Sequence, residues 1–273
     1  MTANLLGTTV DGVLGEVFDE GPDDLFVVNP SADTIESVVE TATYYEGDLP
    51  EIRMLADERL LKDVMDDFLV ASNTADLIEA DTLSLRTVED STRSSLLVTE
   101  DATVALVAAG DDVGGLVTDD EEFVDAAYEA VEADWESADE YTLRTPGISR
   151  IRQTLDEDIS PEVEEDFENV LASLETARGD GDGLDEVTIS LLVAARNRVL
   201  LYDISKWGED VGIASKATFS RTKTKLEDMG LIDTEKVPID VGRPRLRLKL
   251  SDDRLQDAPP SELANVAQSI LAS

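Results

Sequence analysis

The order of patterned segments between residues 187 and 250 constrains the fold more than any other feature of the sequence. Three segments carry apolar residues on one side, as amphipathic helices do, and two alternate apolar and polar residues, as strands do. The helical segments are Val187–Leu200, Ile204–Val211 and Lys216–Met229, and the strands are Leu231–Val237 and Arg245–Leu250. Ser215 suits the N-cap of the third helix, and Gly212 and Gly230 suit two helix ends. This order predicts a winged helix-turn-helix.

The predicted third helix has an apolar face and a polar face. Its apolar positions recur every three or four residues, so this face should pack on the other two helices. They are Phe219, Thr222, Leu226 and Met229. The other side carries small and basic side chains, which suit entry into a major groove and contact with base edges or phosphates. The DNA-binding residues predicted on this side are Ser215, Lys216, Ala217, Thr218, Ser220, Arg221, Thr224 and Lys225.

The predicted wing adds cations close together in the sequence. Arg243, Arg245, Arg247 and Lys249 lie within one short stretch, and alternation puts the last three on one face of a strand. Such a face fits contacts with phosphates or the minor groove. The same alternation also occurs on edge strands that avoid aggregation. Because these cations follow a helix-turn-helix pattern, we predict that all four bind DNA.

The charge of the chain is very uneven. The sequence has 62 acidic and 22 basic residues, for a net charge of −40. Residues 1–178 hold 46 acidic and 9 basic residues, net −37, whereas residues 189–250 hold 8 and 12, net +4. Because acidic residues are interspersed with 42% hydrophobic ones, the composition favours a folded protein of a halophile over a disordered chain. The segment that escapes the acidic bias is where we expect a polyanion to bind.

Several classes of site are excluded by what the sequence lacks. It has no Cys and no His, which rules out disulfides, Cys- or His-based zinc sites and Cys or His catalysis. No glycine-rich phosphate loop of Rossmann or Walker type occurs, and we predict neither a cofactor nor a metal. No apolar run approaches the roughly 18 residues of a transmembrane helix. The start of the chain lacks a basic signal-peptide region, so we expect a cytoplasmic protein with no membrane partner.

The N-terminal part predicts an α/β fold. Strands at 24–29, 51–56 and 83–88 alternate with helices, which implies a parallel sheet. Three further short strands, at 95–98, 103–107 and 113–117, predict an antiparallel extension. The helices are expected at 6–18, 32–44 (capped by Ser31), 57–69 (capped by Asp57) and 119–135, the last burying Phe123, Ala127, Tyr128 and Val131. The predicted fold class is α/β, with a mostly parallel sheet domain of phospholipase-D-like or Rossmann-like layout before the winged helix-turn-helix.

Four segments are expected along the chain. They are an α/β sensor or dimerisation domain at 1–145, connecting helices and a linker at 146–183, the winged helix-turn-helix at 184–256, and a C-terminal helix at 257–273. Gly179–Gly183, with alternating Gly and Asp, predicts a flexible linker. It resembles a calcium loop only superficially, because the closing Glu is missing.

Two roles for the N-terminal domain remain open. As a sensor, it could bind an anion beyond the carboxyl ends of its strands, at helix N-termini and arginines. The candidate ligand residues are Asn29, Ser31, Asp33, Arg53, Asp57, Arg59, Arg86 and Arg93. As a scaffold it would only join two copies, since helix-turn-helix proteins usually bind DNA as dimers. A third role, metal-assisted hydrolysis at Asp111–Asp112 or Asp119–Asp120, is not favoured, because paired acids occur throughout the chain and phospholipase-D chemistry needs His.

Three segments of the C-terminal part resemble archaeal winged-helix regulators. They are Leu200–Ser205, Ala217–Arg221 and Lys225–Ile232, the last with the pattern L-E-x-x-G-L-I that leads from the recognition helix into the wing. With the opening Asn4–Val10 and the layout of 273 residues, the chain resembles the haloarchaeal TbsP family, named as suppressors of the sugar-metabolism regulator TrmB. TrmB-type proteins place the DNA-binding domain first, whereas here it follows the sensor-like region.

The resemblance implies a transcriptional regulator of central carbon metabolism, including gluconeogenic genes. It implies DNA contacts on the third helix, around 215–225, and on the wing, around 243–249. It also makes a sugar phosphate the first class of effector to test. We therefore predict a homodimeric repressor that binds double-stranded promoter DNA and responds to such a metabolite.

Overall fold

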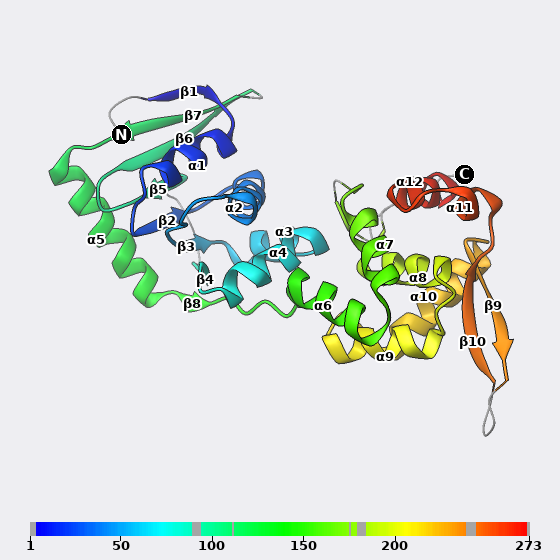
Figure 1. Ribbon diagram of the computed structural model, residues 1–273. Helices are drawn as coiled ribbons and strands as arrows, with labels where there is room; N and C mark the ends of the chain where they lie inside the picture. Colours follow the sequence, from blue (N-terminus) through cyan, green and yellow to red (C-terminus); the bar gives the residue numbers. More distant parts are fainter. Residues whose placement is uncertain are drawn as a thin grey trace. The chain divides into compact units, whose positions relative to one another are not determined.

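The computed structural model describes residues 4–88, 94–110, 112–174, 176–178, 184–238 and 244–271 (Figure 1). They form two compact units. Unit 1 comprises Met1–Asp66 and Asn73–Leu143, and unit 2 comprises Asp67–Ser72 and Arg144–Ser273. Among the described residues, no helix has the length and apolar character needed to cross a membrane.

In the described part of unit 1, eight strands form one sheet in the order β1-β7-β6-β5-β2-β3-β4-β8. The strands are β1 Leu5–Thr8, β2 Asp24–Val28, β3 Glu51–Ala56, β4 Leu83–Thr87, β5 Leu96–Val98, β6 Thr103–Ala109, β7 Asp112–Thr118 and β8 Asp139–Glu140. Strands β2, β3 and β4 are parallel. The other pairs in the described sheet are antiparallel. The α/β class is confirmed, with the parallel strands and the antiparallel extension where the sequence predicted them.

The helices that belong to or enter unit 1 begin at sites that their sequences favour. They are α1 Val10–Asp19, α2 Ala32–Tyr44, α3 Glu58–Val64, α4 Phe68–Glu79 and α5 Glu121–Ser137. Ser31 Oγ accepts the Thr34 N–H, and Asp57 Oδ1 accepts the N–H groups of Arg59 and Leu60. Both predicted N-caps are therefore confirmed.

Helix α5 covers only part of the sheet. Its Val131 packs in a buried cluster with residues of β2, β3 and β5, which are Phe26, Val28, Leu55 and Val98. In Figure 1, α5 starts after β7 and ends just before β8. On the other face, a Cβ on Gly115 of β7 would lie 3.3 Å from a methyl group of Val13, which shows how closely α1 packs there.

Three local predictions in unit 1 are wrong. Leu6 lies in strand β1 and not at the start of the first helix, because Leu5 pairs with Gly115 of β7. The helix expected over 57–69 is divided into α3 and α4, since the Asp67 carboxylate accepts the Leu69 N–H and caps a new helix. Phe123, expected on the buried face of α5, is 55% exposed.

Unit 2 contains the winged helix-turn-helix that the sequence predicted. Its elements are α6 Ile148–Asp158, α7 Pro161–Leu171, α8 Glu186–Arg196, α9 Leu201–Val211, α10 Lys216–Asp228, β9 Ile232–Val237, β10 Arg245–Leu250, α11 Asp253–Asp257 and α12 Pro260–Leu271. Strands β9 and β10 form an antiparallel pair, and Leu200 adds a single bridge to Arg247. The predicted linker Gly179–Gly183 lies outside the described residues.

The helices of the helix-turn-helix approach each other closely. Gly212, with φ of 99°, and Gly230, with φ of 74°, follow α9 and α10 in the left-handed conformation that favours glycine. A Cβ on Gly208 would lie 2.3 Å from the ring of Phe219, so only glycine fits at this crossing. Trp207 Nε1 donates a 2.9 Å hydrogen bond to Thr154 Oγ1 of α6. Trp207 is 3% exposed, so its ring is part of the core of unit 2.

One short segment from the first half of the chain belongs to unit 2. Phe68 is buried in the same apolar cluster as Ile151, Leu155 and Phe167. The Phe68 N–H donates to the Ala177 carbonyl at 3.1 Å. The Asp67 carboxylate accepts the Ala177 N–H in return. Asp67 and Phe68 are thus built into the core that supports the winged helix-turn-helix.

Candidate nucleic-acid interface

The polar face of α10 points to solvent, as its sequence predicted. Phe219 and Leu226 are buried on the side that packs against the rest of unit 2, and Thr222 and Met229 are half-buried. Of the predicted DNA-binding residues, Ser215, Ala217, Ser220, Arg221, Thr224 and Lys225 are exposed, and Lys216 and Thr218 are half-buried. The structure therefore brings these residues together on one open surface, which we call the α10 face.

Hydrogen bonds along this helix orient its central arginine. Ser215 Oγ accepts the Thr218 N–H at 3.2 Å and lies 3.0 Å from Thr218 Oγ1. Arg221 Nη2 donates to the same Thr218 Oγ1 at 3.3 Å. The three residues follow one another at intervals of three, so they lie along one side of the helix. The guanidinium of Arg221 is held beside the start of α10 by neutral partners.

The cations of α10 differ in their ionic partners. Lys216 is paired with Glu209 of α9, and its ammonium lowers the pKa of the Glu209 carboxyl. Lys223 Nζ lies 2.6 Å from Glu227 Oε2, one turn further along. Arg221 and Lys225 have no ionic partner among the described residues. These two cations, one turn apart on the exposed side, are available to a polyanion.

The three cations of β10 are each paired with a carboxylate. Arg247 Nη1 lies 3.5 Å from Glu235 Oε1. Lys249 Nζ lies 2.7 Å from Asp233 Oδ2. Both acids stand directly opposite their partners in the β9–β10 ladder. The hydrogen bond from Lys249 lowers the pKa of the Asp233 carboxyl below its ordinary value. Charges of both signs thus alternate on this surface, which we call the wing face.

Arg245, at the start of β10, has two partners on α9. Its Nη1 lies 3.2 Å from Asp203 Oδ1, and its guanidinium lies 4.3 Å from the centre of the Tyr202 ring. Tyr202 is 48% exposed and has Arg245 over its ring. Glu235 also takes Arg198 Nη2 at 2.9 Å. The remaining predicted wing residue, Arg243, lies outside the described residues.

Comparison with known proteins decides the family. The model described as "Transcriptional regulator TbsP-like, N-terminal" matches residues 2–146, and "Transcriptional regulator TbsP-like, C-terminal HTH domain" matches residues 147–268. The chain belongs to the TbsP-like family of transcriptional regulators. It is therefore a transcriptional regulator with a helix-turn-helix DNA-binding domain, and its predicted family resemblance is confirmed.

Beyond the TbsP-like family the likeness is remote. No curated protein matches the chain. One solved structure that matches is TrmBL2, described as an archaeal chromatin protein that shows a novel mode of DNA binding. It is 15% identical with a TM-score of 0.34, and the match covers 51% of this chain and 53% of that one. The chain thus spans about half the length of this solved protein.

The described anion-ligand candidates of this TbsP-like regulator lie on and between β2, α2, β3, α3 and β4 of unit 1. Ser31 and Asp57 are occupied as N-caps. Arg53 pairs with Glu51 and Asp24. Arg86 donates to the Trp135 carbonyl at 2.5 Å and lies 4.7 Å from the centre of its ring. Asn29 and Asp33 flank the start of α2, Arg59 is exposed on α3, and Arg93 is outside the described residues.

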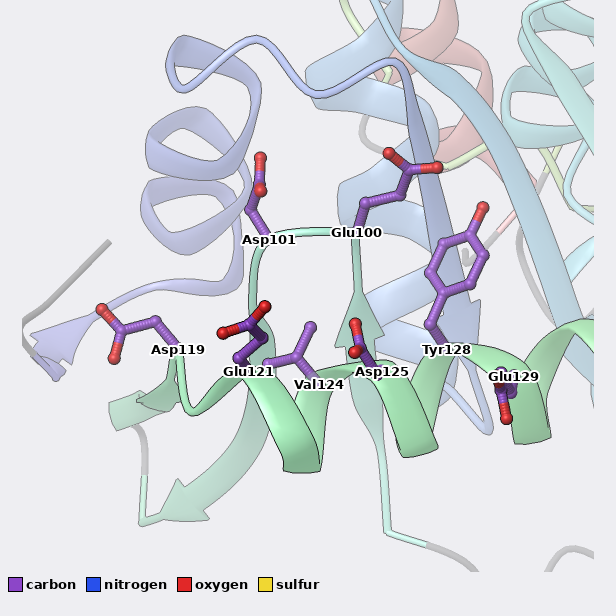
Figure 2. A pocket seen from close by; sticks show the side chains of 8 residues that line it. All are labelled: Glu100, Asp101, Asp119, Glu121, Val124, Asp125, Tyr128 and Glu129. Atoms are coloured by element: carbon purple, nitrogen blue, oxygen red, sulfur yellow. The ribbon is translucent and has the colours of Figure 1, made fainter.

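Unit 1 instead contains an acidic hollow that sequence reasoning missed. It has a volume of about 630 Å³ and lies between α5 and the turn that joins β5 to β6 (Figure 2). The lining residues are Glu100, Asp101, Asp119, Glu121, Val124, Asp125, Tyr128 and Glu129. The Tyr128 hydroxyl donates to Asp24 Oδ2 at 2.5 Å, and burial raises the pKa of this phenol. Six carboxylates, and no cation of the described part of the chain, line this hollow, so it repels anions. Within so acidic a sequence, no pattern distinguished these residues.

The described residues give no support to the hydrolase alternative. Among the residues described, no group of carboxylates is placed to hold a metal ion. Asp119 and Asp120 lie at the start of α5, where the Asp120 carboxylate accepts the Phe123 N–H as an N-cap. Asp111 lies outside the described residues.

Proposed function

We propose that this regulator reads promoter DNA with the α10 face. The observation that carries this proposal is that Arg221 and Lys225 have no carboxylate partner among the described residues, in a chain of net charge −40. In the major groove, Arg221 would donate to a guanine edge, while Lys225 would contact a phosphate. Ala217 and Ser220 are exposed on the same helix and are small enough to allow a close approach to the bases.

The wing would position the protein on the DNA backbone. Arg245, Arg247 and Lys249 each bind a carboxylate in the free protein, so contact with phosphate must exchange or share these partners. We infer that the wing contributes little to affinity and that Arg221 contributes most of the sequence preference. An acidic chain of this kind suits a high salt concentration, at which counterion release contributes little to DNA affinity. Direct base contacts then supply a larger share of the affinity.

A matched pair of alanine variants tests this assignment. Arg221→Ala and Arg254→Ala each remove one arginine from unit 2, and Arg254 pairs only with the neighbouring Asp252 among the described residues. Binding to fragments of natural promoters is measured by fluorescence anisotropy at matched salt, with melting temperatures as a check on folding. Arg221→Ala should bind about 10- to 100-fold more weakly and lose base preference, since a good bidentate contact is worth about 1–3 kcal/mol. Equal affinity of both variants and wild type would refute the assignment.

We further propose that the regulator is a homodimeric repressor of central carbon metabolism, including gluconeogenic genes. Its membership of the TbsP-like family supports this choice of target genes. Chromatin immunoprecipitation with sequencing, on cells grown on glucose and on glycerol, would identify the promoters occupied. Occupancy that ignores carbon source, or that avoids metabolic genes, would contradict the proposal.

A sugar phosphate bound to unit 1 is the effector to test first. Thermal shift with millimolar glycolytic intermediates should reveal stabilisation, with Arg59→Ala compared against wild type because Arg59 is exposed and has no ionic partner among the described residues. The alternative is that unit 1 only joins two copies. The engagement of Arg53 and Arg86 by protein partners favours this alternative. If no intermediate raises the melting temperature, the alternative that unit 1 only joins two copies is supported.

A further inference from the structure

Part of one face of the unit 1 sheet is left open by α5. On this face Phe26 pairs with Val98, and Val98 pairs with Thr103 of β6. Side chains that are directly paired, or two residues apart along a strand, lie on the same face. Val107 lies four positions after Thr103 and is therefore on this face. Leu116 is on it too, because it pairs with Ala105, two positions after Thr103. Helix α5 packs against β2, β3 and β5 but leaves Val107 and Leu116 each 45% exposed.

This open surface is uncharged in a chain that is otherwise acidic. We call it the β6–β7 face and define it by Ala105, Val107, Gly114 and Leu116, which the register places side by side. Residues 102–110 and 113–118 contain no charged side chain, although 31% of the whole chain is charged. Exposed apolar side chains on neighbouring strands favour association and aggregation unless another surface covers them.

We propose that the β6–β7 face is where two copies of this chain meet. Residues 1–178 carry a net charge of −37, so two copies repel wherever their acidic surfaces approach. An uncharged apolar face avoids this cost and is complementary to itself, as a two-fold contact requires. The four residues that define this face offer no cation to a polyanion and no acid to a basic partner, and Asp112 of β7 lies at its rim. The charge pattern therefore selects a second copy over a charged partner.

The sheets of the two copies would pack face to face, with Val107 and Leu116 of each copy in the centre. Such contacts place sheets about 10 Å apart, which small and β-branched side chains allow. This inference rests on the proposed function, because a regulator that reads two half-sites needs two α10 faces. Molar salt screens the repulsion between copies and strengthens apolar contacts, so the dimer should become more stable as KCl rises. An interface held by ion pairs would weaken instead.

Sedimentation of the full chain across a KCl series tests the interface. Val107→Asp combined with Leu116→Asp should give a monomer at every salt concentration, while wild type should be dimeric at molar KCl. Tyr44→Asp is the matched control, because Tyr44 is also an apolar residue of unit 1 and is 73% exposed. The control should dimerise like wild type. A wild-type monomer at all salt concentrations, or a double variant that dimerises normally, would overturn the proposal.

Crosslinking gives a second measurement that does not depend on charged substitutions. The chain has no cysteine, so Leu116→Cys and Tyr44→Cys each introduce a single thiol. A short bis-maleimide should join two copies of Leu116→Cys in high yield at molar KCl and should leave Tyr44→Cys uncoupled. Equal yields from both variants would show that the β6–β7 face is not at the two-fold axis.

DNA binding separates failure of this inference from failure of the proposed function. The double Asp variant should bind a duplex with two half-sites about 100-fold more weakly than wild type, because linkage between two sites is lost. Its binding to a single half-site should remain unchanged and should still depend on Arg221. If dimers form through another surface but Arg221 still controls DNA binding, this inference is wrong and the proposed function stands.

Discussion

The α10 face and the wing face carry cations in different states. On α10, Arg221 and Lys225 have no carboxylate partner among the described residues. On the wing, the cations of β10 are all paired with acids. The local net charge of +4, which includes both surfaces, does not distinguish them. The partners of a cation, rather than the number of cations, therefore decide which charges remain available to DNA.

Geometry explains the difference. Within a helix, a residue four positions away can pair with a cation. Lys223 has Glu227 at that distance, whereas Arg221 has Lys225 and Lys225 has Met229. On a two-stranded ladder a directly opposite residue can pair with a cation, because the two Cβ atoms are only about 4.5–5.5 Å apart. Lys249 of the wing has Asp233 opposite.

The largest effect is expected from changing the shape of the cation at position 221. Arg221→Lys keeps the charge but loses the planar guanidinium that can donate twice to a guanine. Binding to a preferred promoter should fall about tenfold or more, and discrimination between promoter and random DNA should fall with it. Arg245→Lys, the same change on the wing face, should leave discrimination intact. Competition binding against random DNA measures both, and equal losses would remove the distinction between the two surfaces.

The next effect comes from moving α10 without touching the wing. Gly208→Ala puts a methyl group against the ring of Phe219, which should cost about 1–3 kcal/mol of unfolding free energy by overpacking. The DNA affinity should fall as α10 shifts. Gly15→Ala is the control, because a Cβ at Gly15 in α1 meets nothing within 4 Å and should stabilise that helix. Denaturant unfolding of both variants is the measurement, and an unaffected Gly208→Ala variant would contradict the close helix contact.

A smaller effect is expected from the second free cation of α10. Lys225→Ala should weaken binding several-fold on every sequence, because contact with phosphate carries no base information. The slope of log affinity against log salt should become less steep by about one unit. Lys223→Ala removes a lysine that is already paired with Glu227 and should change the slope less. If the two variants have the same slope, an ion pair with a carboxylate does not determine whether a lysine is available to DNA.

The smallest effect has the opposite sign. Glu235→Gln removes the carboxylate that holds both Arg198 and Arg247, so these cations become available to phosphate. DNA binding should tighten by about two- to fivefold, and the salt dependence should become steeper. Asp252→Asn, which releases Arg254 away from the ladder, serves as the control. Weaker binding by Glu235→Gln would mean that the paired wing already has the conformation that binds DNA.

Local signals in the sequence predicted most of the fold. Ser31, Asp57 and Ser215 were identified as N-caps because the capping hydrogen bond involves neighbouring residues only. Strand β1 was missed because its pairing with β7 joins segments more than 100 residues apart, and a short apolar run cannot show that. The exposure of Phe123 depends on how far α5 reaches across the sheet, which periodicity alone does not reveal.

The residues of the α10 face were predictable for the same reason, since the faces of a helix follow from its period. The ion pairing of the wing cations was not predictable, because it depends on the register of β10 against β9. A shift of one residue would have placed Lys249 away from Asp233 and left it free. The acidic hollow was also hidden, because its carboxylates come from α5 and a distant turn.

The position of Phe68 affects how the family could have evolved. The two family models divide the chain between residues 146 and 147, yet the core of the DNA-binding half contains a side chain from position 68. A polypeptide that begins at residue 147 lacks this ring, and loss of a buried phenylalanine costs about 3–5 kcal/mol. It also leaves the Ala177 N–H without the Asp67 carboxylate. The two halves are therefore expected to be inherited together, since gene fusion or exchange at the apparent boundary would produce an incomplete core.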